Sequence, residues 1–158
     1  MRPAVPFLLC IVLAIPCAAA ERQSWNKIRY IGGTVPVEAS RYDWNTTLTF
    51  TQKPESVVIV IAPAKIFHAG ETIRFKPAQV VSLSAGPAAW RRVADVPGAH
   101  LPDKPPSLFG LLQDYALMGI VYDKEDGTRG AILLETQFSW RILPVLSKLS
   151  GKPIEATP

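Results

Sequence analysis

The side chains best suited to catalysis or metal binding in this chain are its two histidines, His68 and His100. Neither has a cysteine or carboxylate partner at metal-ligand spacing, and there is no H-E-x-x-H pattern. The sequence also lacks the G-x-S-x-G nucleophile elbow, the phosphate-binding P-loop and the glycine-rich dinucleotide fingerprint. The sequence therefore predicts no metal and no cofactor. It leaves an enzymatic role undecided while favouring a non-enzymatic one.

Two acidic groups keep an alternative open. Asp103 and Asp114 could meet His100 over a pocket beneath a proline-rich loop, as the acid and base of a small hydrolase or lipid-handling enzyme. The acidic run Asp123–Asp126 does not match the twelve-residue calcium loop. We expect that run to form a solvated hairpin turn.

The cluster Trp90-Arg91-Arg92 is the strongest candidate for a binding surface. Arginine beside an aromatic ring can grip a carboxylate or phosphate, or stack on the ring. If Arg74 and Lys76, on the outer side of a predicted strand, lay nearby, a basic aromatic patch would form. The competing interpretation, which we favour, is that Trp90 anchors its loop to the core and both arginines are solvated or pair with Asp95.

The first twenty residues have the features of a secretory signal. Arg2 is followed by the apolar run Phe7–Ile15, and Ala18-Ala19-Ala20 forms an A-x-A-like cleavage site. We expect cleavage near Ala20 and export to the periplasm or the medium, with no membrane span afterwards. A retained anchor is the alternative, although the apolar run is shorter than a spanning helix requires. Lipidation of Cys17 is disfavoured by the proline before it.

Removal of residues 1–20 would leave one ordinary domain without cysteine. Both cysteines, Cys10 and Cys17, lie in that segment, so stability must come from an apolar core. Loss of Arg2 would lower the formal charge from +4 to +3. So mild a charge does not point to nucleic acid, which usually meets a clustered basic face. Asn45-Thr46-Thr47 is a glycosylation sequon only in a eukaryotic source.

Short apolar segments separated by turn residues predict a β sandwich or barrel. We treat residues 21–33 as a lead-in, in which residues 25–30 could form a short helical turn or a strand, ended by the turn glycines Gly32-Gly33. The expected strands cover residues 34–39 (an edge strand bearing Pro36), 45–51, 56–61, 64–68 (with Ile66 and His68 on one face), 72–76, 79–85, 115–122 and 129–135. In the segment 79–85, either Val81 with Leu83 or Val80 with Ser82 would face inward.

The proline-rich stretch 86–107 interrupts this rhythm. Connections this long are uncommon in compact domains and tend to be functional or disordered. A short helix near residues 88–94 is compatible with the sequence. The apolar segment 107–113, around Phe109, is expected to pack against the core, and it could instead serve an oligomer interface together with the edge strand.

An amphipathic helix is predicted before Gly151. Phe138, Ile142, Val145, Leu146 and Leu149 fall on one helical face, and Arg141 and Lys148 lie opposite. Gly151 followed by Lys152-Pro153 is a typical helix end. Pro144 should kink the helix or delay its start. Residues 152–158 are expected to be a tail.

About seven short strands followed by one C-terminal helix resembles the pleckstrin-homology-like (PH-like) architecture, a bent antiparallel β sandwich or barrel capped by that helix. The stretch from Glu71 to Leu83, in which a strand passes through Pro77 into a V-x-x-L strand, is similar to a segment of bacterial members of that superfamily. The chain also resembles small exported bacterial proteins without assigned activity. The resemblance covers residues 34–151 and implies a fold, but no ligand.

Lipid-headgroup binding is not implied by this resemblance. Phosphoinositide-binding members carry clustered basic residues around their first hairpin. The corresponding loop here offers only Arg41, with Lys27 and Arg29 before it.

The hypothesis that these observations favour is an exported, non-enzymatic binding or assembly module. Its partner would be a protein or another component of the cell envelope, and its surface would include Trp90, Arg91, Arg92, Arg74 and Lys76. The small-enzyme hypothesis and a structural, oligomerising subunit are the alternatives. The oligomeric state is not predicted.

Overall fold

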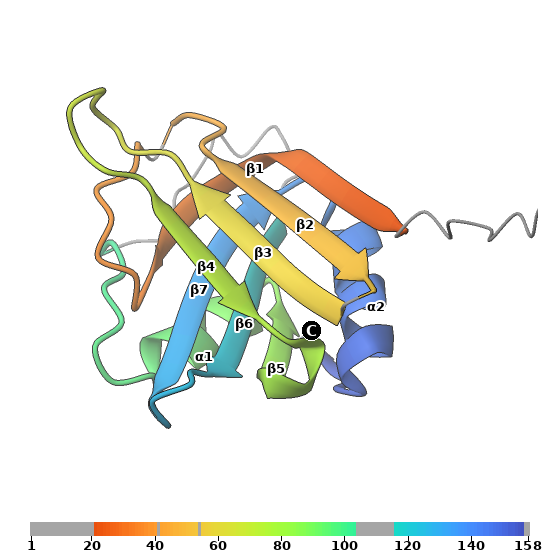
Figure 1. Ribbon diagram of the computed structural model, residues 1–158. Coiled ribbons are helices and arrows are strands. Elements are labelled where there is room, and N and C mark those ends of the chain that lie inside the picture. The colour runs from red at the N-terminus through yellow and green to blue at the C-terminus, as the bar shows by residue number, and fades with distance from the viewer. Residues whose placement is uncertain (1–20, 41, 54, 104–115, 157–158) are drawn as a thin grey trace, which may run out of the picture.

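The computed structural model describes residues 21–40, 42–53, 55–103 and 116–156, and within them eight strands form a single mixed sheet. The strands are β1 (Arg22–Gly33), β2 (Thr46–Gln52), β3 (Glu55–Ile61), β4 (Glu71–Phe75), β5 (Val80–Ala85), β6 (Ala116–Asp123), β7 (Arg129–Thr136) and β8 (Ile154–Ala156). The helices are η1 (Pro77–Gln79, a 3₁₀ turn), α1 (Pro87–Ala94) and α2 (Ser139–Ser150). The described fold is mainly β, as the sequence predicts (Figure 1).

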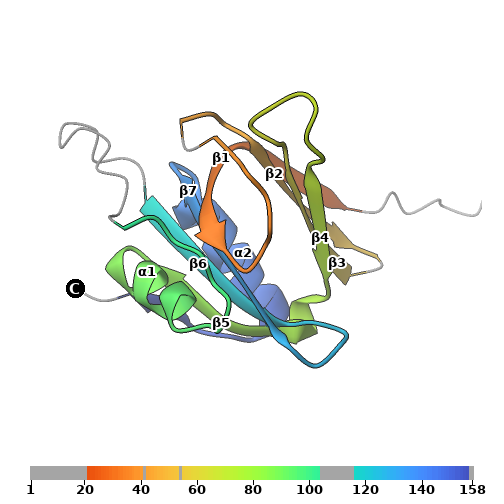
Figure 2. The same ribbon diagram turned by 90° about the vertical axis from the view of Figure 1, so that its left-hand side faces the viewer.

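The strand order is β4-β3-β2-β1-β7-β6-β5-β8, and β1 joins the two halves of the sheet. Its first half pairs with β2 and its second half with β7, and Ile28 is paired with Thr46 on one side and Thr136 on the other. Register shifts interrupt β1 between Trp25 and Ile28 and again after Tyr30. Because bulges increase the local twist, the sheet folds over into two facing layers (Figure 2).

Residues 21–33 are therefore not a lead-in, and a domain start at residue 34 is wrong. The apolar residues Trp25 and Ile28 are three positions apart because a bulge lies between them. The insertion of an extra residue breaks the period of two by which a strand is recognised in a sequence. Gly32 and Gly33 end this strand rather than making a free turn, and Gly33 pairs with His100.

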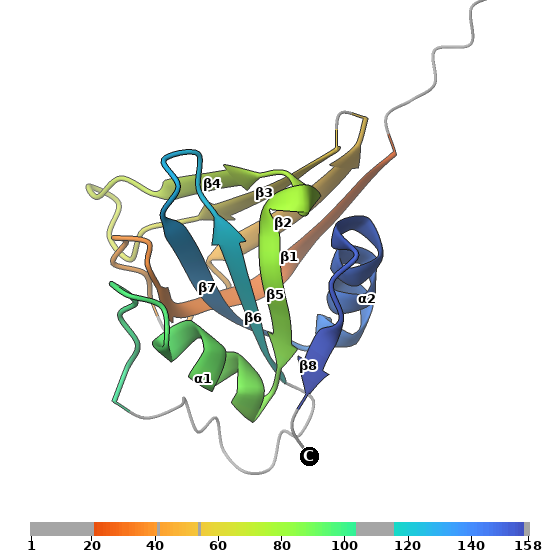
Figure 3. The same cartoon turned by 90° about the horizontal axis from the view of Figure 1, so that it is seen from below.

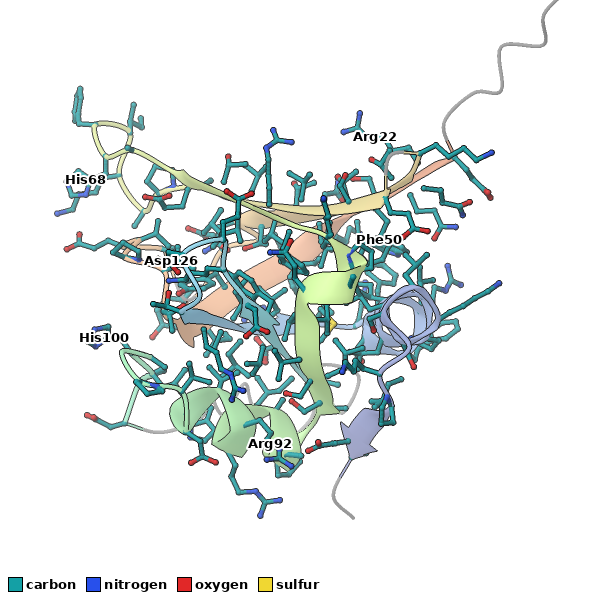
Figure 4. All side chains as sticks on the ribbon, turned by 60° about the horizontal axis from the view of Figure 1, so that its bottom comes forward. Arg22, Phe50, His68, Arg92, His100 and Asp126 are labelled. Atoms are coloured by element: carbon teal, nitrogen blue, oxygen red, sulfur yellow. The ribbon has the colours of Figure 1, made fainter. Side chains whose placement is uncertain are left out.

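The main core lies between the two layers and is closed by α2. Phe50 points into it (Figure 4), and the fully buried residues include Leu48, Ile59, Leu83, Ile120, Ile132 and Ile142. Leu143 and Leu146 of α2 are also buried in this cluster, and Phe138, Val145 and Leu149 pack at its margin. Figure 3 shows α2 lying along one side of the layers, beside β5 and β8. The predicted closing helix is confirmed.

Pro144 lies inside α2 rather than at a late start. The helix begins at Ser139, and the amides of Arg141 and Ile142 both donate to the Phe138 carbonyl. The side chain of Pro144 is exposed, so its ring costs a hydrogen bond without disturbing the buried face. Gly151 ends the helix with φ of 69°, as expected from its position.

A second apolar cluster lies on the other side of β6 and β7, under α1. It contains Ile31, Ala89, Val93, Val96, Val121, Ala131 and Leu133. The short helix within segment 86–107 is thus confirmed, and it covers the outer face of the sheet. Its backbone approaches β6 closely, since a Cβ on Gly119 would lie 3.1 Å from the Cα of Ala89.

Three predicted elements differ from the structure. Residues 34–39 form no strand, although Val35 and Val37 still pack against the main core. Residues 64–68 form an exposed loop: β3 ends at Ile61, Pro63 cannot donate to a ladder, and none of the described strands pairs with this segment. Residues 154–156, expected to be tail, pair with β5 as β8. The segment 107–113 lies outside the described residues.

In β5 the inward residues are Val80 and Leu83, one from each of the two predicted sets. A register shift between Val80 and Ser82 explains this mixture, because it changes which face the following residues occupy.

Gly33 provides a test of the close contact between β1 and β7. Its φ is +149°, and an added Cβ would lie 2.1 Å from the carbonyl oxygen of Ala131. We predict that Gly33→Ala lowers the free energy of unfolding by about 3 kcal/mol, measured by chemical denaturation. Gly127→Ala is the matched control. Gly127 also has a positive φ, of +81°, but open space around it, so its loss should be only about 1 kcal/mol. Equal losses would contradict this account.

Candidate functional site

The structure divides the predicted basic aromatic cluster. Trp90 is half-buried and packs against the second apolar cluster, so it anchors α1 to the sheet. Arg91 and Arg92 are exposed and line a cleft of about 500 Å³ between α1 and β8. The Arg92 Nε atom lies 2.5 Å from a carboxylate oxygen of Glu155 on β8 (Figure 4 labels Arg92). The interpretation of Trp90 as an anchor is confirmed, and Arg92 pairs with Glu155 rather than with Asp95.

Arg74 and Lys76 do not join this cluster. Arg74 lines a different cleft, of about 430 Å³, together with Thr34, Tyr122 and the β6–β7 turn. Lys76 precedes η1, where its backbone amide donates to the Gln79 side chain. The single basic patch that would have required all five residues to lie together is therefore not formed.

The two histidines lie on different segments (Figure 4). His68 is on the loop between β3 and β4, and its Nδ1 lies 3.6 Å from a Glu38 carboxylate oxygen. His100 is exposed at the rim of a cleft of about 300 Å³ that Glu38 also lines, yet no ion pair joins it to any described carboxylate. Asp103 is exposed, and Asp114 lies outside the described residues. Among the described residues, no three histidine, cysteine or acidic side chains gather as a metal site.

The acidic run Asp123–Asp126 forms a hairpin turn, as predicted. A carboxylate oxygen of Asp126 accepts hydrogen bonds from the Thr128 hydroxyl at 2.6 Å and the Thr128 amide at 2.8 Å. These bonds lower the pKa of Asp126, the hydroxyl contributing most. Asp123 lies 3.7 Å from Arg129. The carboxylates stabilise the turn itself rather than converging on a cation.

A buried ion pair was not predicted from the sequence. Arg29 on β1 and Glu135 on β7 are direct partners in register, and their charged atoms lie 3.4 Å apart with both side chains almost fully buried. The Arg29 guanidinium also lies 4.4 Å from the ring centre of Trp44. Burial raises the pKa of Glu135, while the charge of Arg29 opposes that rise. The nearby charge of Arg29 therefore favours the ionised form of Glu135, which burial disfavours.

The most exposed apolar side chains of the described residues were also missed. Ile66 is 95% exposed and Phe67 98%, at the end of the β3–β4 loop. We call residues 65–68 the loop tip. It projects from the body of the molecule (Figure 1), with His68 at its end (Figure 4). The sequence predicted a strand over residues 64–68, in which Ile66 would be at least partly covered, whereas the structure leaves it in water.

Backbone hydrogen bonds fix the base of this loop. The amide of Ala62 donates to the Asn45 carbonyl and the amide of Ala64 to the Glu38 carbonyl, each at 2.8 Å. Within the loop, the His68 amide donates to the Lys65 carbonyl. The tip is thus a defined projection held against the segment that precedes β2.

The Asn45 side chain orders that preceding segment. Its oxygen accepts hydrogen bonds from the Tyr30 amide and the Thr46 hydroxyl, and its nitrogen donates to the Ser40 carbonyl at 2.7 Å. With both its oxygen and its nitrogen hydrogen-bonded, the Asn45 side-chain amide has a structural role in this segment.

Removal of one member of the buried ion pair should be costly. We predict that Arg29→Met lowers the free energy of unfolding by about 3 kcal/mol at neutral pH, because Glu135 is left as an uncompensated buried charge. The double variant Arg29→Met/Glu135→Leu should lie within about 1 kcal/mol of wild type.

The loss of stability caused by Arg29→Met should depend on pH, in a direction set by the pKa of Glu135. A raised Glu135 pKa means that the folded state binds the proton more tightly than the unfolded state, whose pKa is near the ordinary value of 4.5. The loss in Arg29→Met should therefore shrink as the pH falls through that raised pKa. A loss that is constant with pH, or a double variant as unstable as the single one, would contradict the assignment.

Comparison of the chain with protein-family models, with curated proteins and with solved structures found no match.

Proposed function

We propose that this protein is an exported, non-enzymatic binding module that makes contact with its partner through the loop tip. The observation that carries the proposal is the near-complete exposure of Ile66 and Phe67, two adjacent large apolar side chains on a loop with a fixed base. Exposed apolar groups of this kind are costly in water, and they commonly mark interaction sites. The partner is a component of the cell envelope or of the extracellular space.

In this proposal the loop tip replaces the cluster Trp90-Arg91-Arg92, which the sequence favoured as the binding surface. Trp90 is packed against the sheet and Arg92 is paired with Glu155, so these side chains already have structural partners. Arg91 and Arg74 are exposed but lie in separate clefts. They remain secondary candidates for polar contacts at the edge of an interface.

The architecture that best accounts for the fold is PH-like. In support of this, β1–β4 and β5–β7 form the two facing layers, and α2 follows the last of these strands and closes the core between them. On this proposal α1 and β8 are additions to the common pattern, and the domain begins with β1 rather than at residue 34. Among the described residues, no helix is long and apolar enough to cross a bilayer.

The small-enzyme alternative has less support. It needs a cavity beneath segment 86–107, whereas Ala89, Val93 and Val96 of that segment fill the space against β6 and β7. The cleft beside His100 is the place where an acid–base pair would have to form, and Glu38, the acidic residue among its described lining, lies 3.6 Å from His68.

Export makes a prediction about the N-terminus. Protein recovered from the periplasm or medium of an exporting bacterial host should have the mass of a chain beginning at Glu21, because the peptidase cleaves after the small residues Ala18–Ala20. Intact mass spectrometry measures this. Recovery of the uncleaved chain in the membrane fraction would instead support an anchor.

The loop tip makes a prediction about binding. Wild-type protein should co-sediment with the envelope fraction of the exporting host, and Ile66→Ser/Phe67→Ser should reduce the bound fraction about tenfold or more, since two apolar contacts are lost. Trp140→Ser is the matched control, because Trp140 is 65% exposed but lies on α2, away from the tip. Equal binding by all three proteins would refute the proposed surface.

A further inference from the structure

We infer that the partner of the loop tip is a lipid surface, into which Ile66 and Phe67 insert while Lys65 contacts anionic headgroups. This inference rests on the proposed function and names the partner of the same site. It concerns insertion of apolar side chains, and it requires no pocket for an individual headgroup.

The chemistry of the loop fits the boundary of a bilayer. Residues 62–70 contain apolar and small residues, one lysine and one histidine, and no acidic side chain. Glu71 lies at the foot of the loop, where its backbone pairs with Ile61, and the exposed Glu38 carboxylate lies 3.6 Å from the His68 ring. The apolar side chains and the cationic Lys65 are therefore presented together, at the projecting end.

The shape of the loop favours a fluid partner over a folded one. A stable protein interface typically covers about 800 Å² on each partner and has a central apolar anchor within a broad rim. Here the two most exposed apolar side chains of the described residues are neighbours on a narrow projection, flanked by Lys65 and His68 and then by small residues (Ala64, Ala69 and Gly70). Lipid can surround such a projection on all sides, whereas a protein would need a matching socket.

The adjoining segment adds an amphipathic side chain. Tyr42 is 82% exposed and belongs to the segment that backbone bonds hold against the loop base. Tyrosine is enriched at the interface between bilayer and water, because its ring is apolar and its hydroxyl polar. It could rest at headgroup level when the tip inserts.

The expected affinity is modest. Burial of one isoleucine and one phenylalanine should strengthen binding by about a hundredfold or more, a gain that the preformed loop does not lose to ordering. A single myristoyl chain gives a membrane association constant on the order of 10⁴ M⁻¹, so the contact should be reversible and should be strengthened by anionic lipid.

The test uses vesicle flotation with the protein as recovered from the exporting host, all variants having the same N-terminus by mass. The probes are vesicles of phosphatidylcholine alone and of phosphatidylcholine mixed with phosphatidylglycerol. Wild type should float with both and more strongly with the mixture. Ile66→Ser/Phe67→Ser should weaken binding by about a hundredfold or more on both, Lys65→Glu should lose binding mainly on the mixture, and Trp140→Ser should behave as wild type.

Two outcomes would overturn the inference, and they differ in what they say about the proposed function. If wild type does not bind vesicles but Ile66→Ser/Phe67→Ser still loses binding to the envelope fraction, the tip binds a protein, and only the lipid partner is wrong. If the double serine variant binds both vesicles and the envelope fraction as wild type does, the tip is not the contact surface and both proposals fail.

Discussion

The fold depends on one strand being hydrogen-bonded to both halves of the sheet. β1 pairs with β2 along its first half and with β7 along its second, and Ile28 is the residue at which the two ladders overlap. Without this shared strand, β2–β4 and β5–β7 would be two small sheets, each with an exposed apolar face. Because β1 twists at its register shifts, those faces meet, and α2 needs to close only one side of the resulting core.

The close packing at the end of β1 links this core to the second one. Gly33 lies against the Ala131 carbonyl of β7 and pairs with His100, so the chain that follows α1 is tied directly to the central strand. On the outer face of β6 and β7, α1 covers Val121 and Leu133. No described residue covers the tip of the β3–β4 loop in this way. The packing that buries the two apolar clusters leaves Ile66 and Phe67 in water.

Strands with a regular alternation could be predicted from the sequence, and so could the closing helix. The alternation of Leu48 and Phe50 with threonines specifies β2, and the stripe through Ile142 and Leu146 specifies α2. The sequence left residues 25–30 open between a helical turn and a strand, because the bulges of β1 break the alternation. α1 as a cover for the sheet was missed, although β6 and β7 are apolar on both faces, which is the signal of strands buried on both sides. The exposure of Ile66 could not be predicted, because it depends on which strands lie beside each other in the sheet, and the local sequence does not determine that.

The candidate site shows the same division. The anchoring role of Trp90 and the turn formed by Asp123–Asp126 are local features, and local sequence was sufficient for them. The Arg29–Glu135 pair joins residues far apart in the chain, so only the strand register reveals it.

The most direct test of the central claim, that β1 unites both halves of the sheet, is native-state hydrogen exchange followed by mass spectrometry or NMR. We expect the paired amides of β1, β2 and β7 to exchange only through global unfolding, with one common free energy, while the amides of the exposed residues 65–67 exchange much faster. Opening of β2–β4 separately from β5–β7, with β1 amides as labile as the loops, would contradict it.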